Sequence, residues 1–277
     1  MTTQDTGWRR DREGLGLWKQ QGKVAITGWG MSPVDRRWDG VSMNETLGAY
    51  CILAAQRALE DAGVKPEEVD GLLQCPNNMA GATGGSSANW GPTRPYFAPP
   101  YDSEDGLSIV TGKWMLNNMP GLTNVEFAPE VVPDIGEGMG MAAQAVADGK
   151  CTVALYIYTA NNLEGRYRRG GENLEDYARG ARQWTVPWGN HGGNDWINSI
   201  PIQQYCTLYG TTWDEFLAPF VVNQHRNGLM NPWGFYTMHE PYEFTREDYV
   251  TSRHIIYPLR IWDCDRPVNA AGAFVFT

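Results

Sequence analysis

The chain has 277 residues, of which 32 are acidic and 22 basic, giving a net charge of −10 with 42% hydrophobic residues. A chain of this length and hydrophobicity can bury a sizeable core, in one large domain or two small ones. The acidic balance excludes nonspecific nucleic-acid binding, which requires a basic surface, but it is compatible with a local basic pocket for an anionic ligand.

Cysteine and histidine spacing indicates neither a metal site nor a disulfide framework. There are five cysteines without a CxxC pair and four histidines without HxH or HxxxH spacing. An odd cysteine count of this kind is typical of a reducing compartment. Residues 1–22 are polar and read as a loose arm without the apolar core of a signal peptide. No run is long enough to span a membrane, so we expect a cytoplasmic protein.

The first part of the chain after the arm predicts a strand–helix–strand unit. KVAITGWG (23–30) is an apolar strand that ends in glycines. Ser42 and Glu45 form a capping box before an amphipathic helix that Gly63 terminates. VDGLLQC (69–75) predicts the second strand. This order favours a parallel sheet in an α/β fold.

Two long irregular stretches follow, at 76–105 and 161–198, and both are rich in turn-forming residues. Loops of such length inside a compact domain are usually functional or form interfaces. A short helix is predicted at 106–119. After the second stretch we predict two helices within 200–230, the second started by Thr211 or Thr212. Residues 241–254 are expected to hold a further, acid-capped helix, TREDYVTSRH, and PLRIWDCDRPVNAAGAFVFT predicts two apolar strands joined by a turn.

The stretch between the two loops predicts a second strand–helix–strand unit. Residues 123–128 and 151–159 are apolar strand patterns around a helix at 134–148 that has almost no charge after Glu137. Such a helix is expected to be buried on all sides, and the strand CTVALYIYT to be covered on both faces. The turn at 133–138 directs the free N–H groups of the helix start toward whatever lies above the strands. We therefore expect this turn to form the floor of a site.

Four segments, in order, resemble the thiolase superfamily, and in particular its lipid-transfer-protein or SCP2-thiolase branch. They are KVAITGWGMSPV, NETLGAYCILAAQRALEDAGVKPEEVDGLL, MAAQAVADGKCTVALYI and PLRIWDCDRPVNAAGAFVFT. The resemblance implies a layered αβαβα fold made of two similar halves. Residues 23–277 would form the first half, with 160–256 as a loop and helical insertion. The second half is absent from this sequence, so the chain is either a fragment or stops at the boundary between the halves.

The resemblance also exposes a departure from ordinary thiolases. The family has a nucleophilic cysteine at the start of the central helix, which corresponds here to residues 132–134, yet no cysteine occurs from 125 to 150. Cys151 follows the far end of the helix, roughly 20 Å away at 1.5 Å per residue. Without a thiolate, no acyl-enzyme can form at this position. The family's GHP and CxGGG-like motifs are absent as well.

Cysteine-free relatives of this kind include aldolases that shorten steroid side chains. The resemblance implies a lyase that cleaves a β-hydroxyacyl-CoA with a bulky, steroid acyl group by a retro-aldol step. Coenzyme A would be part of the substrate, with no other cofactor. The resemblance also implies a homodimer of the thiolase type and a DUF35 partner with an OB fold. It further implies that the acid–base residues, including tyrosines, lie largely in the second half. The alternatives are an acyltransferase of thiolase type and a non-catalytic subunit that binds acyl-CoA or lipid.

The turn at the start of the central helix is the first candidate substrate-binding site. Its residues Asp134, Gly136, Glu137 and Gly138 would offer an oxyanion or acyl site. The alternative is a tight packing turn, in which Asp134 is a helix cap and Glu137 complements the helix dipole.

The second irregular stretch contains two further candidates. GRYRRGG presents Arg166, Arg168 and Arg169, whose guanidinium groups suit the phosphates of coenzyme A. The alternative is a solvated face that pairs with nearby glutamates.

WGNHGGNDW presents His191 as a candidate catalytic residue in a glycine-rich loop, with Trp188 and Asn190 as substrate-binding candidates. An aromatic contact with a partner is the alternative interpretation of this run. The other three histidines lie on or near predicted helices, and we interpret them as structural or surface residues.

Overall fold

The computed structural model of the chain describes residues 18–75, 106, 110–133, 135–160, 183 and 194–277 apart from 265 and 267. Within these residues the main sheet has four strands in the order β1-β6-β3-β2. The strands are β1 (Ile26–Met31), β2 (Gly71–Cys75), β3 (Ala154–Ala160) and β6 (Ala270–Phe276). All four overlap segments that the sequence predicted as strands, with β1 and β3 each one residue longer at the carboxyl end.

The sheet is mixed, so the expectation of a parallel sheet is only partly right. β2 pairs with β3 in parallel. β6 lies between β1 and β3 and runs antiparallel to both, so β1 and β3 point in the same direction without pairing. Pairs such as Ile26 with Phe276 join residues from opposite ends of the chain. Local patterning could not predict this insertion, because the partner strand is remote in sequence.

The predicted strand at 123–128 is reduced to a single parallel bridge between Phe127 and Gly71. Leu72 donates its N–H to the Phe127 carbonyl at 2.8 Å, and the Phe127 N–H donates to the Asp70 carbonyl at 3.0 Å. Pro129, two residues further on, has no N–H to donate, which stops the pairing from extending. This segment therefore lies beside β2 at the sheet edge opposite β1.

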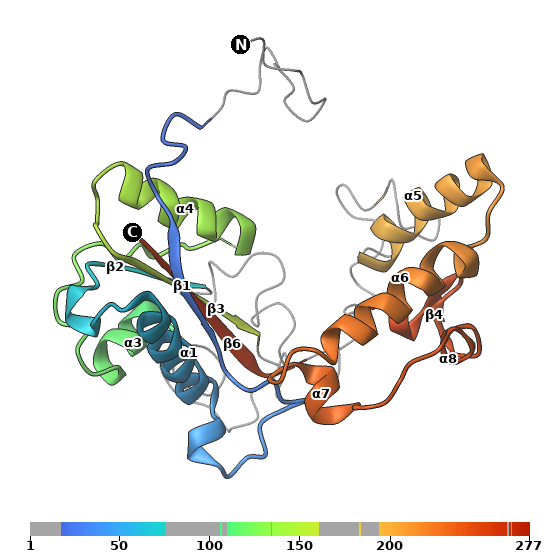
Figure 1. The fold of residues 1–277 in the computed structure, drawn as a ribbon, viewed down its shortest axis with the longest axis horizontal. Coiled ribbons are helices and arrows are strands. Elements are labelled where there is room, and N and C mark those ends of the chain that lie inside the picture. Colours follow the sequence, from blue (N-terminus) through green and yellow to red (C-terminus); the bar gives the residue numbers. More distant parts are fainter. Residues whose placement is uncertain are drawn as a thin grey trace.

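Helices cover both faces of the sheet (Figure 1). On one face lie α1 (Leu47–Ala62) and α3 (Gly112–Asn118), which share a core cluster with β3 and β6. Gly63 ends α1 with a φ of 67°, as predicted. The predicted capping box is wrong, because the cap is Thr46, whose hydroxyl accepts from the Ala49 N–H at 3.2 Å. Ser42 instead precedes the short 3₁₀ helix η1 (Met43–Glu45) and donates its hydroxyl to Asp39.

The opposite face carries α4 (Ile135–Ala147), which packs on Leu73 and Tyr156. The sequence predicted a helix buried on all sides, but only Gly138, Ala142 and Ala145 are buried. The sheet covers one side of the helix alone. Ile135 is 46% exposed on the other side. The Trp18 indole, from the segment before β1, reaches this helix and donates to the Gln144 side chain at 2.7 Å.

A helical segment lies between β3 and β6 in the sequence and forms its own part of the structure in Figure 1. It contains α5 (Asn194–Tyr209), α6 (Trp213–Gly228), α7 (Phe235–His239) and α8 (Arg246–Val250). The predicted start of α6 is confirmed at Thr212, which forms a capping box with Glu215. The sequence did not predict α7. Ala218, Val221, Phe244 and Tyr249 form the buried core of this segment.

The two predicted C-terminal strands are only partly confirmed. The first is reduced to β5 (Leu259–Arg260), followed by the 3₁₀ helix η6 (Ile261–Asp263). β5 forms a small antiparallel hairpin with β4 (His254–Ile256), a strand that the sequence did not predict. A further 3₁₀ turn, η2 (Pro66–Glu68), precedes β2. In the described part of the chain, no helix combines the length and apolar character needed to cross a membrane.

Candidate functional site

The carboxyl ends of β1, β2 and β3 lie at the same end of the sheet, because these three strands run in the same direction. This end of the strands is called the carboxyl edge below. The start of β6 reaches the same edge, where Ala160 pairs with Ala270 and Asp35 bridges Asn269. The start of α4 lies there too, since its far end leads into the beginning of β3. Ligands of open α/β sheets bind at this edge. We therefore take it as the location of the candidate site.

The predicted floor, the turn into α4, combines packing with exposed backbone. Gly138 is buried, and a Cβ atom there would lie 2.5 Å from Cε2 of Tyr156 and 2.6 Å from the Pro133 carbonyl oxygen. Packing alone therefore requires a glycine at 138. In contrast, Gly136 and Glu137 are exposed, and a Cβ at Gly136 would meet nothing within 4 Å. These two residues leave the first turn of the helix accessible to a ligand.

The two thiols that share a core cluster with α4, those of Cys75 at the end of β2 and of Cys151, are both buried. Cys151 precedes β3, is 4% exposed and sits against Gly71. Burial, together with the nearby Asp70 carboxylate, raises the pKa of Cys151 to about 11. Burial also raises the pKa of Cys51, within α1. Both cysteines are protonated near neutral pH and shielded, as expected for small core residues.

All of the other predicted site residues lie outside the described residues, so their positions relative to one another are not tested. These are Asp134, Arg166, Arg168, Arg169, Trp188, Asn190 and His191. Among the described residues, no group of three or more His, Cys, Asp and Glu side chains is placed to hold a metal ion.

A polar junction joins the loop after β1 to the end of α7. The Tyr50 hydroxyl, on α1, donates to the Asp35 carboxylate. His239 places Nε2 at 2.7 Å from the Val34 carbonyl oxygen and 3.7 Å from Asp35 Oδ1. Burial, followed by the hydrogen bond to Asp35, raises the pKa of Tyr50. The junction thus sets titratable groups beside the start of β6.

Glu240 extends this junction by accepting from two arginines. Arg36 donates to Oε1 at 2.8 Å and Arg266 donates to Oε2 at 3.1 Å. The guanidinium of Arg266 also lies 4.1 Å from the centre of the Trp262 ring. Because Arg266 is only four residues before β6, this ion-pair group connects the helical segment to the candidate edge of the sheet.

The most unusual side chain next to this group is His225 on α6. It is 1% exposed, and neither ring nitrogen has a hydrogen-bond partner. Four aromatic rings surround it, with centres 4.2 Å (Tyr236), 5.1 Å (Phe244), 5.3 Å (Tyr242) and 6.1 Å (Trp262) away. We refer to these four rings as the aromatic shell. An unsatisfied buried imidazole is rare enough to require an explanation.

Charge and burial around His225 favour neutral side chains. Burial lowers the pKa of His225, with Glu240 opposing the shift and Arg266 adding to it. Burial also raises the pKa of Tyr236 and of Tyr242. The site therefore holds a neutral imidazole beside two protonated phenols. From the sequence, His225 was expected to be a structural or surface residue. The four rings are scattered over residues 236–262 without a helical period, so no pattern indicated that they meet.

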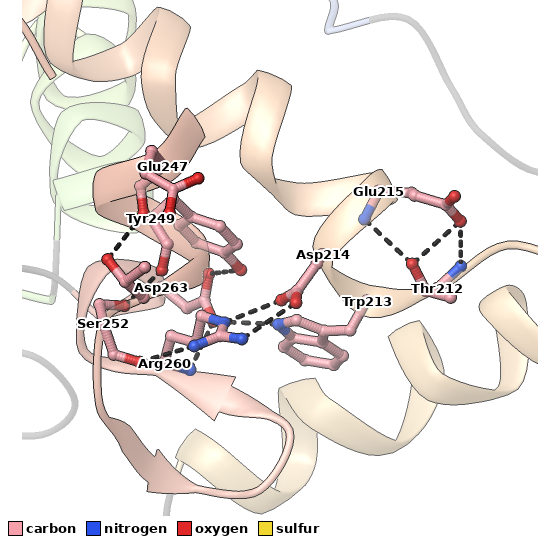
Figure 2. A network of polar contacts seen from close by, with 10 residues as sticks. Thr212, Trp213, Asp214, Glu215, Glu247, Tyr249, Ser252, Arg260 and Asp263 are labelled. Atoms are coloured by element: carbon pink, nitrogen blue, oxygen red, sulfur yellow. Dashed lines mark hydrogen bonds and ion pairs between the residues drawn. The ribbon is translucent and has the colours of Figure 1, made fainter. Parts of the chain in front are cut away.

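A second polar network fixes the helical segment that carries these residues (Figure 2). Arg260 on β5 donates to both carboxylate oxygens of Asp214 and to the Ser252 carbonyl. Asp263 accepts from the Tyr249 hydroxyl at 2.8 Å and from the Trp213 indole at 3.0 Å. The hydrogen bonds drawn in Figure 2 join residues of α6, α8 and β5, so the network holds these three elements together.

Comparison with known proteins identifies relatives of the fold. No family model matches the chain. The steroid side-chain-cleaving aldolase of Thermomonospora curvata is 25% identical over 261 residues, which cover 92% of this chain and 56% of that protein. The chain therefore spans about half the length of the curated relative it matches.

Solved structures agree on the architecture. The Ltp2-ChsH2(DUF35) aldolase has a TM-score of 0.62 at 22% identity, covering 92% of this chain and 55% of that chain. An acetyl-CoA acetyltransferase from Syntrophomonas wolfei has a TM-score of 0.54 at 14% identity, covering 92% and 64%. Human mitochondrial 3-ketoacyl-CoA thiolase, in complex with CoA, has a TM-score of 0.51 at 12% identity, covering 92% and 64%. The chain has a thiolase-like fold and is a relative of a steroid side-chain-cleaving aldolase.

Proposed function

We propose that the chain is part of a carbon–carbon lyase that cleaves a β-hydroxyacyl-CoA thioester by a retro-aldol reaction. The observation that carries this proposal is the start of α4, which has no cysteine in a thiolase-like fold, while the cysteines of the same core cluster are buried. A relative named as an aldolase supports the same reaction class.

The reaction requires proton transfer but no covalent intermediate. A base removes the proton of the β-hydroxyl, and the bond between Cα and Cβ breaks as the carbonyl forms. The electron pair passes into the thioester as an enolate, which is then protonated at Cα to release a shorter acyl-CoA. Backbone N–H groups at the start of α4, near Gly136 and Glu137, are suited to stabilise the enolate oxygen.

The finer features of this proposal come from the resemblance and from the names of relatives. The acyl group is a steroid with a side chain, and Arg166, Arg168 and Arg169 bind the phosphates of coenzyme A. The assembly is a homodimer of the thiolase type with a DUF35 partner, in support of which one structural neighbour is the Ltp2-ChsH2(DUF35) aldolase. The compartment is the cytoplasm.

The test is a cleavage assay with the full chain, alone and with a DUF35 protein. The substrate is a steroid CoA thioester with a tertiary hydroxyl on the β carbon and a methyl group on the α carbon, and products are followed by mass spectrometry. Propionyl-CoA and a steroid ketone in equal amounts are the expected products. The matched thioester without the hydroxyl should not be cleaved, because it has no proton whose removal starts the reaction.

The same assay separates the two alternatives. Transfer of the acyl group to labelled coenzyme A, blocked by iodoacetamide, would identify a thiolase-type acyltransferase instead. Tight binding of the thioester without turnover, with and without the DUF35 protein, would identify a binding subunit.

A further inference from the structure

A pocket of about 370 Å³ lies beside β1, the strand at one side of the main sheet. None of the residues proposed for the cleavage reaction lines this pocket. Its lining combines two tryptophans, one arginine and two carboxylates. The residues are Trp29 and Gly30 of β1, Arg57, Glu60 and Asp61 of α1, and Trp233 from the loop before α7.

Two side chains of α1 bind the backbone of β1 next to the pocket. Asp61 accepts the Trp29 N–H at 3.0 Å, and Arg57 donates to the Met31 carbonyl. These contacts take up backbone groups that a further strand would need in order to pair with β1. A ligand in this pocket therefore meets side chains.

The two indole rings line the pocket together. Their centres lie 6.1 Å apart, and their planes form an angle of 55°. The guanidinium carbon of Arg57 lies 4.8 Å from the centre of the Trp233 ring, so this ring already has a cation against it. The Trp29 side chain is 49% exposed, and no cation of the described chain lies over its ring. Trp29 thus offers a second aromatic face for the same kind of contact.

The charges of the lining also favour a cation. Glu60 and Asp61 are exposed, and Arg57 is the one basic residue among the lining residues, which leaves an excess of one negative charge. Within the described chain, the Glu60 side chain has no hydrogen bond or ion pair, and Asp61 uses only Oδ2. Carboxylate oxygens beside an open indole face are complementary to a cation that has both N–H donors and a flat face.

We propose that this pocket binds a guanidinium group from outside the chain, with its plane against Trp29 and its N–H donors toward Glu60 and Asp61. A guanidinium stacks on aromatic faces and pairs with carboxylates through a planar fork, whereas an ammonium group is a compact and strongly hydrated charge. The group belongs to an arginine of a partner protein or to a free compound of the same chemistry. This binding does not depend on the cleavage reaction.

The test is an NMR titration of the full chain labelled with ¹⁵N at the indoles of its 12 tryptophans, with Trp29→Phe and Trp233→Phe to assign two of the signals. The ligands form two pairs of matched shape. The first pair is N-butylguanidinium and N-butylurea, and the second is the peptide acetyl-Ala-Arg-Ala-amide and the same peptide with citrulline in place of arginine. The urea group is planar and neutral, so the members of each pair differ in charge.

We expect N-butylguanidinium to shift the Trp29 signal in a saturable way, with an affinity about tenfold or more above that of N-butylurea. The affinity should fall as the salt concentration rises. An arginine peptide that binds at least as tightly as N-butylguanidinium assigns the site to an arginine of a partner protein. A markedly weaker peptide assigns it to a free guanidinium compound.

Three substitutions test the carboxylates. Glu60→Gln and Asp61→Asn each remove one charge, and the amide oxygen of the asparagine can still accept the Trp29 N–H. Each should weaken binding of N-butylguanidinium about threefold or more. Glu243→Gln removes an exposed charge between α7 and α8 and should leave the affinity unchanged. A Trp29 signal that moves with no ligand, equal affinities for N-butylguanidinium and N-butylurea, or equal effects of all three substitutions would overturn the proposal.

Discussion

The guanidinium of Arg260 and the carboxylate of Asp214 are joined by two parallel hydrogen bonds, Nε to Oδ1 at 2.8 Å and Nη2 to Oδ2 at 2.9 Å. This pair connects the first turn of α6 to the β4–β5 hairpin. The hydrogen bond from Arg260 is the main cause of the lowered pKa of Asp214. The side chain of Arg260 is 9% exposed and that of Asp214 is 34% exposed, so solvent screens one end of the pair.

We predict that Arg260→Lys destabilises the chain by about 2 kcal/mol, because an ammonium group cannot form both bonds and the Asp214 carboxylate loses a fixed donor. Urea unfolding followed by circular dichroism measures the change. Arg246→Lys, on the exposed first turn of α8, is the control and should leave the midpoint unchanged. A midpoint for Arg260→Lys within error of the parent would contradict the role of this pair.

The two glycine environments on α4 predict opposite effects of the same substitution. Gly138→Ala places a methyl group 2.5 Å from the Tyr156 ring and should cost about 1–3 kcal/mol by overpacking. Gly140→Ala meets no atom within 4 Å and should stabilise the helix by up to about 1 kcal/mol. Thermal unfolding of both variants against the parent tests the pair, and equal shifts of the same sign would refute the packing argument.

The buried thiols predict that the proposed cleavage reaction is resistant to iodoacetamide. At pH 7.5, Cys151 should remain unalkylated in the folded chain while reacting fully in urea, because its pKa is raised to about 11 and it is 4% exposed. Peptide mass spectrometry measures the modification at each cysteine. Cys151→Ser should retain cleavage activity at the parent level. Loss of cleavage that parallels alkylation of any cysteine would instead favour a thiolase-type acyl-enzyme.

His225 predicts a loss of stability on mild acidification. Its folded-state pKa is lowered by burial, so below the unfolded value of about 6.5 the unfolded chain binds a proton that the folded chain excludes. Stability contributed by the neutral buried ring is therefore complete above that value and decreases as the pH falls toward the folded pKa. In urea unfolding between pH 7 and pH 5, His225→Phe should show a flatter decline than the parent, and parallel declines would show that other groups are responsible.

The basic run in the second irregular stretch predicts a substrate-binding defect. Replacing Arg166, Arg168 and Arg169 by Ala should raise KM for the CoA thioester several-fold with little change in kcat, because phosphate contacts remote from the reacting carbons bind substrate and transition state alike. The comparison substrate is the same acyl group on pantetheine, which lacks the nucleotide phosphates. If the variant is equally impaired with both substrates, these arginines do not act on phosphate.

Elements decided by local patterning were predictable from the sequence. Gly63 at the end of α1 and Thr212 at the start of α6 each carry their signal within a few residues, and both are confirmed. The predicted capping box at Ser42 is absent although the sequence pattern fits. The Ser42 hydroxyl donates to Asp39 instead, and Thr46, one turn later, caps the helix. Where two local signals compete, tertiary contacts choose between them.

The features that distance or environment decides could not be read from the sequence. Nothing in the pattern of residues 270–276 specifies insertion between β1 and β3. The apolar composition of α4 predicted full burial, yet composition does not tell whether the covering surface lies in the same chain. The environment of His225 could not be predicted for the same reason. The four aromatic rings around its unpaired nitrogens are brought together only by folding.

The position of β6 also sets an order on folding during synthesis. β1 and β3 have no hydrogen bonds to each other. Both strands pair with residues 270–276, so the sheet can form only after these residues have been synthesised. At a synthesis rate of about 5–20 residues per second, β1 emerges many seconds before this strand. During that interval the apolar edge of β3, with Leu155 and Ile157, has no strand beside it on the β6 side. This part of the nascent chain is therefore most exposed to aggregation before β6 leaves the ribosome, and protection by a chaperone matters most in that interval.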